Sequence, residues 1–132
     1  MKTVWTNGCF DILHRGHIEM FKFAKSLGDQ LIVGLDTDEK VKEAKGDDRP
    51  FNTLVDREFV VSSIRYVDKT FSFNSQKQLA HLIKSIHPDI LVVGSDWEGK
   101  YVVGAEYAKE VIFFPRVDGY STTKVLKNDN IR

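Results

Sequence analysis

Two runs of uninterrupted apolar residues, 31–35 (LIVGL) and 90–94 (ILVVG), constrain the fold more than any other feature of this 132-residue chain. A strand with one face in water alternates apolar and polar residues, whereas neither run has a polar position. Both runs therefore predict strands covered on both faces. Such strands are typical of a parallel sheet that lies between two layers of helices.

The rest of the chain alternates in the same way. Residues 2–6, 69–73 and 111–114 predict three further strands. The helical patterns are residues 18–27 with Gly28 at the end, a short helix capped by Thr37, one from Asn52 or Thr53 to about residue 66, one capped by Ser75 and Gln78, and a closing helix over 121–127. We expect one domain over residues 1–132: a three-layer, Rossmann-like α/β fold with a five-stranded parallel sheet of strand order 3-2-1-4-5.

Composition narrows the function. Nineteen basic side chains balance nineteen acidic ones, which argues against a general nucleic-acid or membrane-surface binder. No signal peptide and no apolar run of membrane-spanning length is visible, and a single cysteine allows no internal disulfide. We therefore expect a cytoplasmic protein. The chain also lacks the glycine patterns of a Rossmann dehydrogenase and of a P-loop.

The strongest functional signal is residues 6–17 (TNGCFDILHRGH), which join the first strand to the first helix. A strand-to-helix turn directs backbone N–H groups and a positive helix dipole at one point, which suits a phosphate. Gly8 and Gly16 allow close approach of backbone to a ligand. His14 and His17 can donate hydrogen bonds or positive charge to phosphate oxygens.

Three more segments carry chemistry. Residues 119–124 (GYSTTK) place hydroxyls and N–H groups at a helix start, and residues 42–52 (KEAKGDDRPFN) form a basic loop. Residues 94–106 (GSDWEGKYVVGAE) follow the fourth strand, whose carboxyl end should face that of the first. Read alone, each could be an ordinary helix cap or a solvated loop.

Taken together, these motifs resemble the nucleotidyltransferase superfamily that carries HxGH near its N-terminus. The likeness spans residues 3–127. The turn, the loop at 45–52 and residues 102–106 are similar to adenylyltransferase domains that make ADP-heptose. Residues 97–100 and Arg116 are similar to glycerol-3-phosphate cytidylyltransferases instead, and the residues do not decide between the two.

The resemblance implies transfer of a nucleotidyl group from a nucleoside triphosphate to a phosphorylated acceptor, with Mg²⁺ and release of pyrophosphate. Catalysis is assigned to His14, His17 and Lys45. The nucleotide is expected to contact Gly8, Cys9, Phe10, Gly16, Gly94, Asp96, Arg116, Gly119, Ser121, Thr122 and Thr123. The acceptor is expected to contact Asp11, Lys42, Arg57 and Lys100.

ATP and heptose 1-phosphate are the preferred substrates, and CTP with glycerol 3-phosphate is the alternative. A non-catalytic nucleotide-binding module is the alternative of another class. The resemblance also suggests a homodimer. No cluster of histidine and cysteine indicates a structural metal, and Cys9 is expected to line the turn through its backbone rather than to act as a nucleophile.

Overall fold

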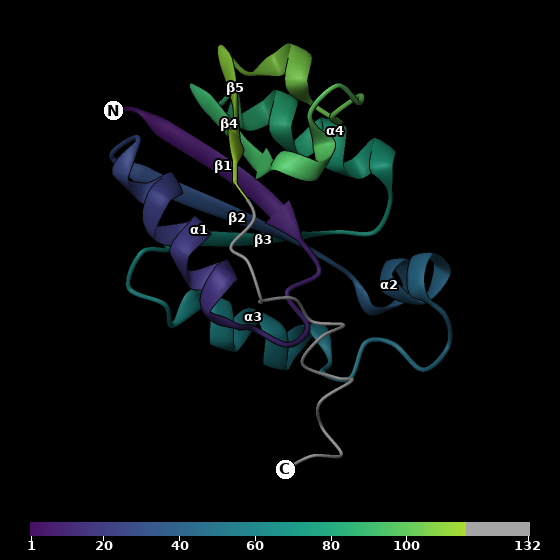
Figure 1. The fold of residues 1–132 in the computed structure, drawn as a ribbon. Helices are drawn as coiled ribbons and strands as arrows, with labels where there is room; N and C mark the ends of the chain where they lie inside the picture. Colours follow the sequence, from purple (N-terminus) through teal and green to yellow (C-terminus); the bar gives the residue numbers. More distant parts are fainter. Residues whose placement is uncertain (116–132) are drawn as a thin grey trace.

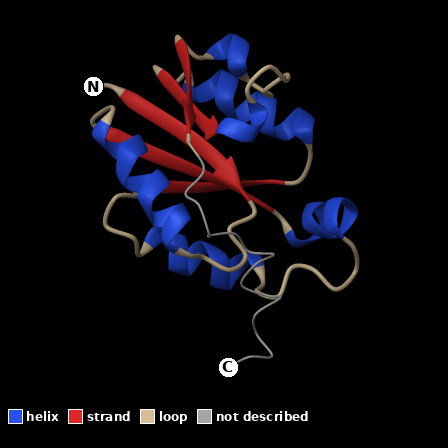
Figure 2. Cartoon of the chain, viewed as in Figure 1, coloured by secondary structure: helices blue, strands red, loops and turns tan. Residues whose placement is uncertain are grey.

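The computed structural model describes residues 1–115, in which helices and strands alternate along the chain (Figures 1 and 2). The closing helix predicted over 121–127 lies outside these residues, as do the predicted site residues Arg116, Gly119, Ser121, Thr122 and Thr123. The elements are β1 (Thr3–Gly8), α1 (Arg15–Ser26), β2 (Gln30–Asp36), α2 (Asp38–Lys45), α3 (Leu54–Ser62), β3 (Lys69–Phe73), α4 (Gln76–Ile86), β4 (Ile90–Gly94) and β5 (Glu110–Phe114).

The five strands form one parallel sheet in the order β3-β2-β1-β4-β5, which confirms the predicted topology. The chain builds β1, β2 and β3 toward one edge and then crosses to the other side of β1 for β4 and β5. The strand order therefore reverses between β1 and β4, and ligands of open α/β sheets bind beside such a reversal.

Successive side chains of each strand point to opposite faces of the sheet, which divides the core into two layers. Val4 and Leu31 pack on the face covered by α1 and α3, whereas Trp5 and Ile32 pack on the face covered by α4. All four side chains are buried, with 4% exposure or less. The unbroken apolar runs of the sequence thus correspond to strands covered on both sides, as Figure 2 shows.

Tertiary structure moved several predicted boundaries. β1 continues to Gly8 because Asn7 and Gly8 pair in register with Gly34 and Leu35 of β2. α2 extends to Lys45, so residues 42–45 of the predicted basic loop are helical and the loop itself begins at Gly46. α3 ends at Ser62 rather than near residue 66.

The early end of α3 has a local cause. The hydroxyls of Ser62 and Ser63 both donate to the carbonyl of Phe59, at 3.1 and 2.7 Å. Serine hydroxyls that bond to backbone in this way compete with helical hydrogen bonds. At α4, Ser75 caps the helix as predicted, but the Gln78 side chain accepts from Asn74 rather than from Ser75.

A crevice opens where the strand order reverses. β1 and β4 are paired only at Val4 with Ile90 and Trp5 with Leu91. Beyond this point the Thr6 hydroxyl, rather than a backbone N–H, donates to the carbonyl of Val92 at 2.8 Å. The carboxyl ends of β1 and β4 are thus joined by a side chain, and the space above them is open to a ligand. Within residues 1–115, no helix is long and apolar enough to cross a membrane.

Candidate functional site

The turn between β1 and α1 fixes both histidine rings by hydrogen bonds to backbone. His14 is the N-cap of α1, and its Nδ1 accepts the N–H of Gly16 at 3.0 Å. Nδ1 of His17 accepts the N–H of His14 at 3.3 Å, so that the two residues form a reciprocal capping box. A ring nitrogen that accepts a hydrogen bond carries no proton, so the neutral rings carry theirs on Nε2.

The two rings lie together, with centroids 4.0 Å apart and planes inclined by 31°. Burial, together with the charges of His14 and Lys45, lowers the pKa of His17 to about 4. His17 is therefore neutral at pH 7. The sequence allowed His17 to offer an anion either a hydrogen bond or a positive charge. In its neutral form it can offer only the Nε2–H hydrogen bond.

Phe10 holds the turn in shape. Its backbone has a φ of +51°, an uncommon conformation for a residue other than glycine. Its buried ring meets the ring of His17 edge-on, with centroids 5.6 Å apart. A Cβ on Gly8 would lie 3.0 Å from the tip of the Phe10 ring, so the ring occupies the space that glycine leaves. Phe10 thus supports the turn from inside the core.

Asp11, which the sequence predicts to contact the acceptor substrate, is held by protein donors in this structure. Its side chain is 1% exposed and accepts the N–H groups of Phe51 and Asn52, each at 2.8 Å, and Nε of Arg49 at 3.3 Å. Burial alone would raise the pKa of Asp11, but these three hydrogen bonds hold it below its usual value. Asp11 therefore fastens the loop before α3 to the turn between β1 and α1.

Arg57, also predicted to contact the acceptor substrate, is likewise held by protein groups. Its side chain is fully buried in α3, where its guanidinium donates to the carbonyls of Cys9, Asp36 and Asn52 at 2.8–3.0 Å and to the carboxylate of Asp38 at 2.6 Å. These acceptors belong to the ends of β1 and β2, the start of α2 and the loop before α3. The guanidinium thus joins four segments around the site.

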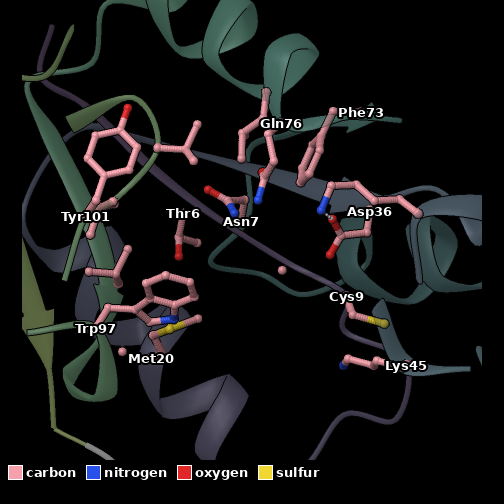
Figure 3. Close-up of a pocket in the computed structure, with 17 residues that line it drawn as sticks. Thr6, Asn7, Cys9, Met20, Asp36, Lys45, Phe73, Gln76, Trp97 and Tyr101 are labelled. Carbon is pink, nitrogen blue, oxygen red and sulfur yellow. Dashed lines mark ion pairs between the residues drawn. The ribbon is translucent and has the colours of Figure 1, made fainter. Parts of the chain in front are cut away.

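A cavity of about 550 Å³ lies over the carboxyl ends of the strands (Figure 3). Figure 3 shows Asp36 and Phe73 toward one end, near Cys9 and Lys45, whereas Met20, Trp97 and Tyr101 lie toward the other. The wall is formed by Thr6, Asn7, Gly8, Cys9, Met20, Asp36, Lys40, Lys45, Phe73, Gln76, Leu79, Val93, Gly94, Trp97, Tyr101, Val102 and Val103.

The structure brings only some of the predicted site residues to this wall. Gly8, Cys9, Lys45 and Gly94 line it. His14, Gly16 and His17 are in the adjoining turn, close enough to Lys45 for its charge to lower the pKa of His17. The remaining described residues are exposed outside the wall: Lys42, Asp96 and Lys100.

Burial raises the pKa of the Cys9 thiol, although the charges of Lys45 and Arg57 oppose this effect. The thiol is therefore protonated at pH 7, a form that is a poor nucleophile. Its place on the cavity wall agrees with the expectation that this residue lines the turn.

Sequence reasoning missed several residues of the wall, notably Asp36, Lys40 and Gln76. The available signal was positional. Asp36 is the last residue of β2 and Gln76 follows β3 by three positions, so both lie at the sheet edge where ligands bind. Lys40 reaches the wall one helical turn after Asp36, with its ammonium 2.9 Å from the Asp36 carboxylate.

Known proteins similar to this chain identify its family. The family model described as cytidylyltransferase-like matches residues 5–128, and the chain belongs to this family. Bifunctional protein HldE of Campylobacter fetus subsp. fetus is 50% identical over 123 residues, which are 93% of this chain and 27% of that protein. HldE of Helicobacter hepaticus is 47% identical over 127 residues, 96% of this chain and 26% of that protein. The chain thus spans about a quarter of the length of these relatives.

A solved structure supports the fold. The lipopolysaccharide core biosynthesis protein from Thermoplasma volcanium GSS1 has a TM-score of 0.69 and 27% identity, with 92% of this chain and 99% of that chain covered. The expected α/β nucleotidyltransferase fold is confirmed, and the family match identifies the chain as a nucleotidyltransferase.

Proposed function

We propose that the protein transfers adenylyl from ATP to the phosphate of heptose 1-phosphate and releases pyrophosphate. The observation that carries this proposal is the pair of imidazoles whose Nδ1 atoms are held by backbone N–H groups, beside a cavity at the strand-order reversal. The likeness to HldE over almost the whole chain supports the acceptor. The turn at residues 6–17 and the loop at 45–52 also support it, because both resemble adenylyltransferase domains that make ADP-heptose.

The chemistry needs no covalent nucleophile from the protein. A phosphate monoester loses its second proton with a pKa of about 6, so its oxygen is already anionic at pH 7. This oxygen attacks the α-phosphorus of the triphosphate, the bond between the α-phosphorus and the bridging oxygen breaks, and pyrophosphate leaves. The protein has to hold two anions together and neutralise the charge that develops.

The residues divide this work. Nε2–H of His14 and of His17 donates to oxygens of the triphosphate, and the Lys45 ammonium on the cavity wall neutralises the transferring phosphoryl group. Residues 119–123 are proposed to hold the leaving β- and γ-phosphates, as the resemblance implies. Arg57 and Asp11 act indirectly because their hydrogen bonds fix the turn and the loop before α3.

Magnesium fits as part of the triphosphate substrate rather than as a resident ion. Within residues 1–115 no group of three or more metal-ligating side chains is gathered. The carboxylates nearest the turn are engaged by protein donors: Asp11 by backbone N–H groups, Asp38 by Arg57 and Asp36 by Lys40. Mg²⁺ usually binds through substrate phosphates and water with few protein ligands.

The cavity suggests where each substrate lies. Trp97 and Tyr101 offer aromatic surface beside β4, and their side chains are 51% and 68% exposed. A nucleobase can stack on such surfaces. The acceptor then occupies the opposite end, beside β2 and β3. The phosphates of both substrates meet between these ends, at the turn after β1.

We further propose a cytoplasmic homodimer that binds no nucleic acid. On α3, Val55 and Phe59 are one helical turn apart and are 76% and 72% exposed, and Phe51 beside them is 58% exposed. Apolar surface of this kind is typical of an interface. Light scattering of the purified chain measures its mass, and Phe59→Asp is expected to convert a dimer into monomers.

The direct experiment is a matrix of four triphosphates against heptose 1-phosphate, glycerol 3-phosphate and other phosphorylated acceptors, with pyrophosphate release measured. ATP with heptose 1-phosphate is the expected pair. CTP with glycerol 3-phosphate is the alternative because residues 97–100 (WEGK) resemble that enzyme class. Triphosphate binding without pyrophosphate release from any pair would instead identify a nucleotide-binding module.

A further inference from the structure

The cavity end beside β2 and β3 contains a charged pair that the transfer chemistry does not use. Nζ of Lys40 lies 2.9 Å from Oδ1 of Asp36, and their side chains are 18% and 17% exposed. Both residues line the cavity. Among the ion pairs within residues 1–115, this is the one with both partners on the cavity wall.

The pair is held in place from several sides. The backbone carbonyl of Asp36 accepts Nη1 of Arg57 at 2.8 Å, which fixes the end of β2. The Lys40 ammonium lies 5.4 Å from the centre of the buried Phe73 ring, a cation–π contact that restrains the long side chain. Groups positioned before a ligand arrives lose little entropy when they bind it.

The chemistry of this end suits hydroxyl groups rather than a second phosphate. The carboxylate and the ammonium of the pair cancel, so the pair itself adds no net charge beside Lys45, which is left as the cation for the acceptor's phosphate. A carboxylate accepts hydrogen bonds from hydroxyls, and an ammonium has three N–H donors, of which the ion pair uses one. Figure 3 shows Gln76 beside Asp36 and Phe73, where its amide adds both a donor and an acceptor.

Apolar side chains complete this end of the cavity. Phe73 lies at this end with Asp36, and Leu79 and Val102 also line the cavity. The faces of a sugar ring carry C–H groups, and its rim carries hydroxyls. A wall that combines apolar surface with a few fixed polar groups is complementary to such a ring.

We propose that Asp36 and Lys40, with Gln76, bind the ring hydroxyls of the acceptor and so determine which phosphorylated compound receives the nucleotidyl group. This inference rests on the proposed function and deepens it. The acceptor is thereby a phosphorylated sugar with several free hydroxyls. Its phosphate extends toward Lys45, and its ring lies against the paired charges.

The test compares Asp36→Asn, Lys40→Met and Gln76→Ala with the wild type. Hydrogen bonds to charged groups are worth about 1.5–3 kcal/mol, so kcat/KM for heptose 1-phosphate should fall about ten- to a hundredfold in the first two variants. The KM for ATP should stay within about twofold. Glycerol 3-phosphate has fewer hydroxyls, so the fall in its kcat/KM should be smaller, which a general loss of structure would not produce.

Lys109→Gln is the matched control. Lys109 pairs with Asp89 at 3.1 Å beside the start of β5, whereas the cavity lies over the carboxyl ends of the strands. This variant should retain wild-type kcat/KM for every acceptor. An active wild type whose three cavity variants keep the wild-type kcat/KM for heptose 1-phosphate would overturn the inference and leave the proposed function intact.

Binding separates the two proposals if no acceptor is turned over. Heptose 1-phosphate is titrated by calorimetry into each protein saturated with a non-hydrolysable ATP analogue. Binding by the wild type, weakened about tenfold or more by Asp36→Asn, would support the acceptor subsite although the proposed transfer had failed. Equal binding by the variant, or no binding by the wild type, would refute the subsite.

Discussion

The two connections that border the cavity are built in opposite ways. The turn after β1 is bound to its surroundings by buried side chains, since Asp11 accepts three hydrogen bonds and Arg57 donates four. The connection from β4 to β5 consists of short 3₁₀ turns at Ser95–Trp97 and Ala105–Tyr107, with exposed aromatic side chains between and beside them.

This difference suits two tasks: the rigid turn can position hydrogen-bond donors, whereas the exposed connection can bind a ligand. A transition state for phosphoryl transfer requires donors that are already in place. In the proposed mechanism the turn after β1 supplies them, because its two histidine rings are fixed at Nδ1. A ligand surface can instead be exposed, because it gains its contacts when the ligand covers it. The one tight feature of the second connection is Gly104, which has a φ of +86° and where a Cβ would lie 2.5 Å from Ile83.

The largest effect should come from breaking the rigid connection at Arg57. Arg57→Met leaves the carbonyls of Cys9, Asp36 and Asn52 and the Asp38 carboxylate without this donor. We expect the free energy of unfolding to fall by about 3 kcal/mol or more, because each buried acceptor left unsatisfied costs about 1–3 kcal/mol. Urea unfolding measures it. Arg65→Met is the control because Arg65 is exposed just beyond the same helix, and a similar loss there would contradict the role given to Arg57.

His17→Ala should affect catalysis more than stability. Loss of one electrostatic donor to a transition state costs about 2.7–4 kcal/mol, or about a hundred- to a thousandfold in kcat. The lost capping bond to His14 costs only about 1 kcal/mol of stability. His14→Ala should behave similarly. His81→Ala, on the exposed side of α4, is the control; a folded His17→Ala enzyme with near-normal turnover would remove the basis of the assignment.

Acid should weaken the rigid connection through His17. Its pKa is about 4 in the folded protein, and a histidine in the unfolded chain has a pKa of about 6.5. The unfolded state therefore binds more protons between these values, so stability is complete above pH 6.5 and falls as the pH drops toward 4, by at most about 3 kcal/mol. Thermal unfolding at pH 7, 5.5 and 4.5 measures this slope. If the stability of His17→Ala falls with pH as steeply as that of the wild type, the acid sensitivity does not come from His17.

The smallest effect is expected in the second connection. Trp97→Ala removes one stacking surface, which is worth about 1–2 kcal/mol of binding free energy. The KM for the triphosphate should therefore rise about five- to thirtyfold. Its unfolding free energy should change little, since Trp97 is half exposed. Trp5 is fully buried, so Trp97 should report triphosphate binding by fluorescence. A normal KM for the triphosphate in Trp97→Ala would place the base elsewhere.

Much of this protein was determined by local sequence. The uninterrupted runs at 31–35 and 90–94 predicted strands covered on both faces, and the alternation of elements predicted the parallel sheet and its order. Caps at Thr37, Thr53 and Ser75 were readable because a side-chain acceptor at a helix start acts within three residues. The position of the turn between β1 and α1 could be predicted for the same reason, because His14 caps α1 through a bond to Gly16.

Only the tertiary structure decided what the charged side chains do. Asp11 and Arg57 resemble ligand-binding residues in the sequence, but all of their partners except the Asn52 carbonyl beside Arg57 come from positions 19 to 48 residues away. Asp36 and Lys40 belong to no recognisable motif, yet the end of β2 and the start of α2 place both on the cavity wall. A motif encodes contacts between neighbours in the chain. The burial and partners of a charge depend on which distant segments fold against it, and burial determines whether that charge supports the site or meets the ligand.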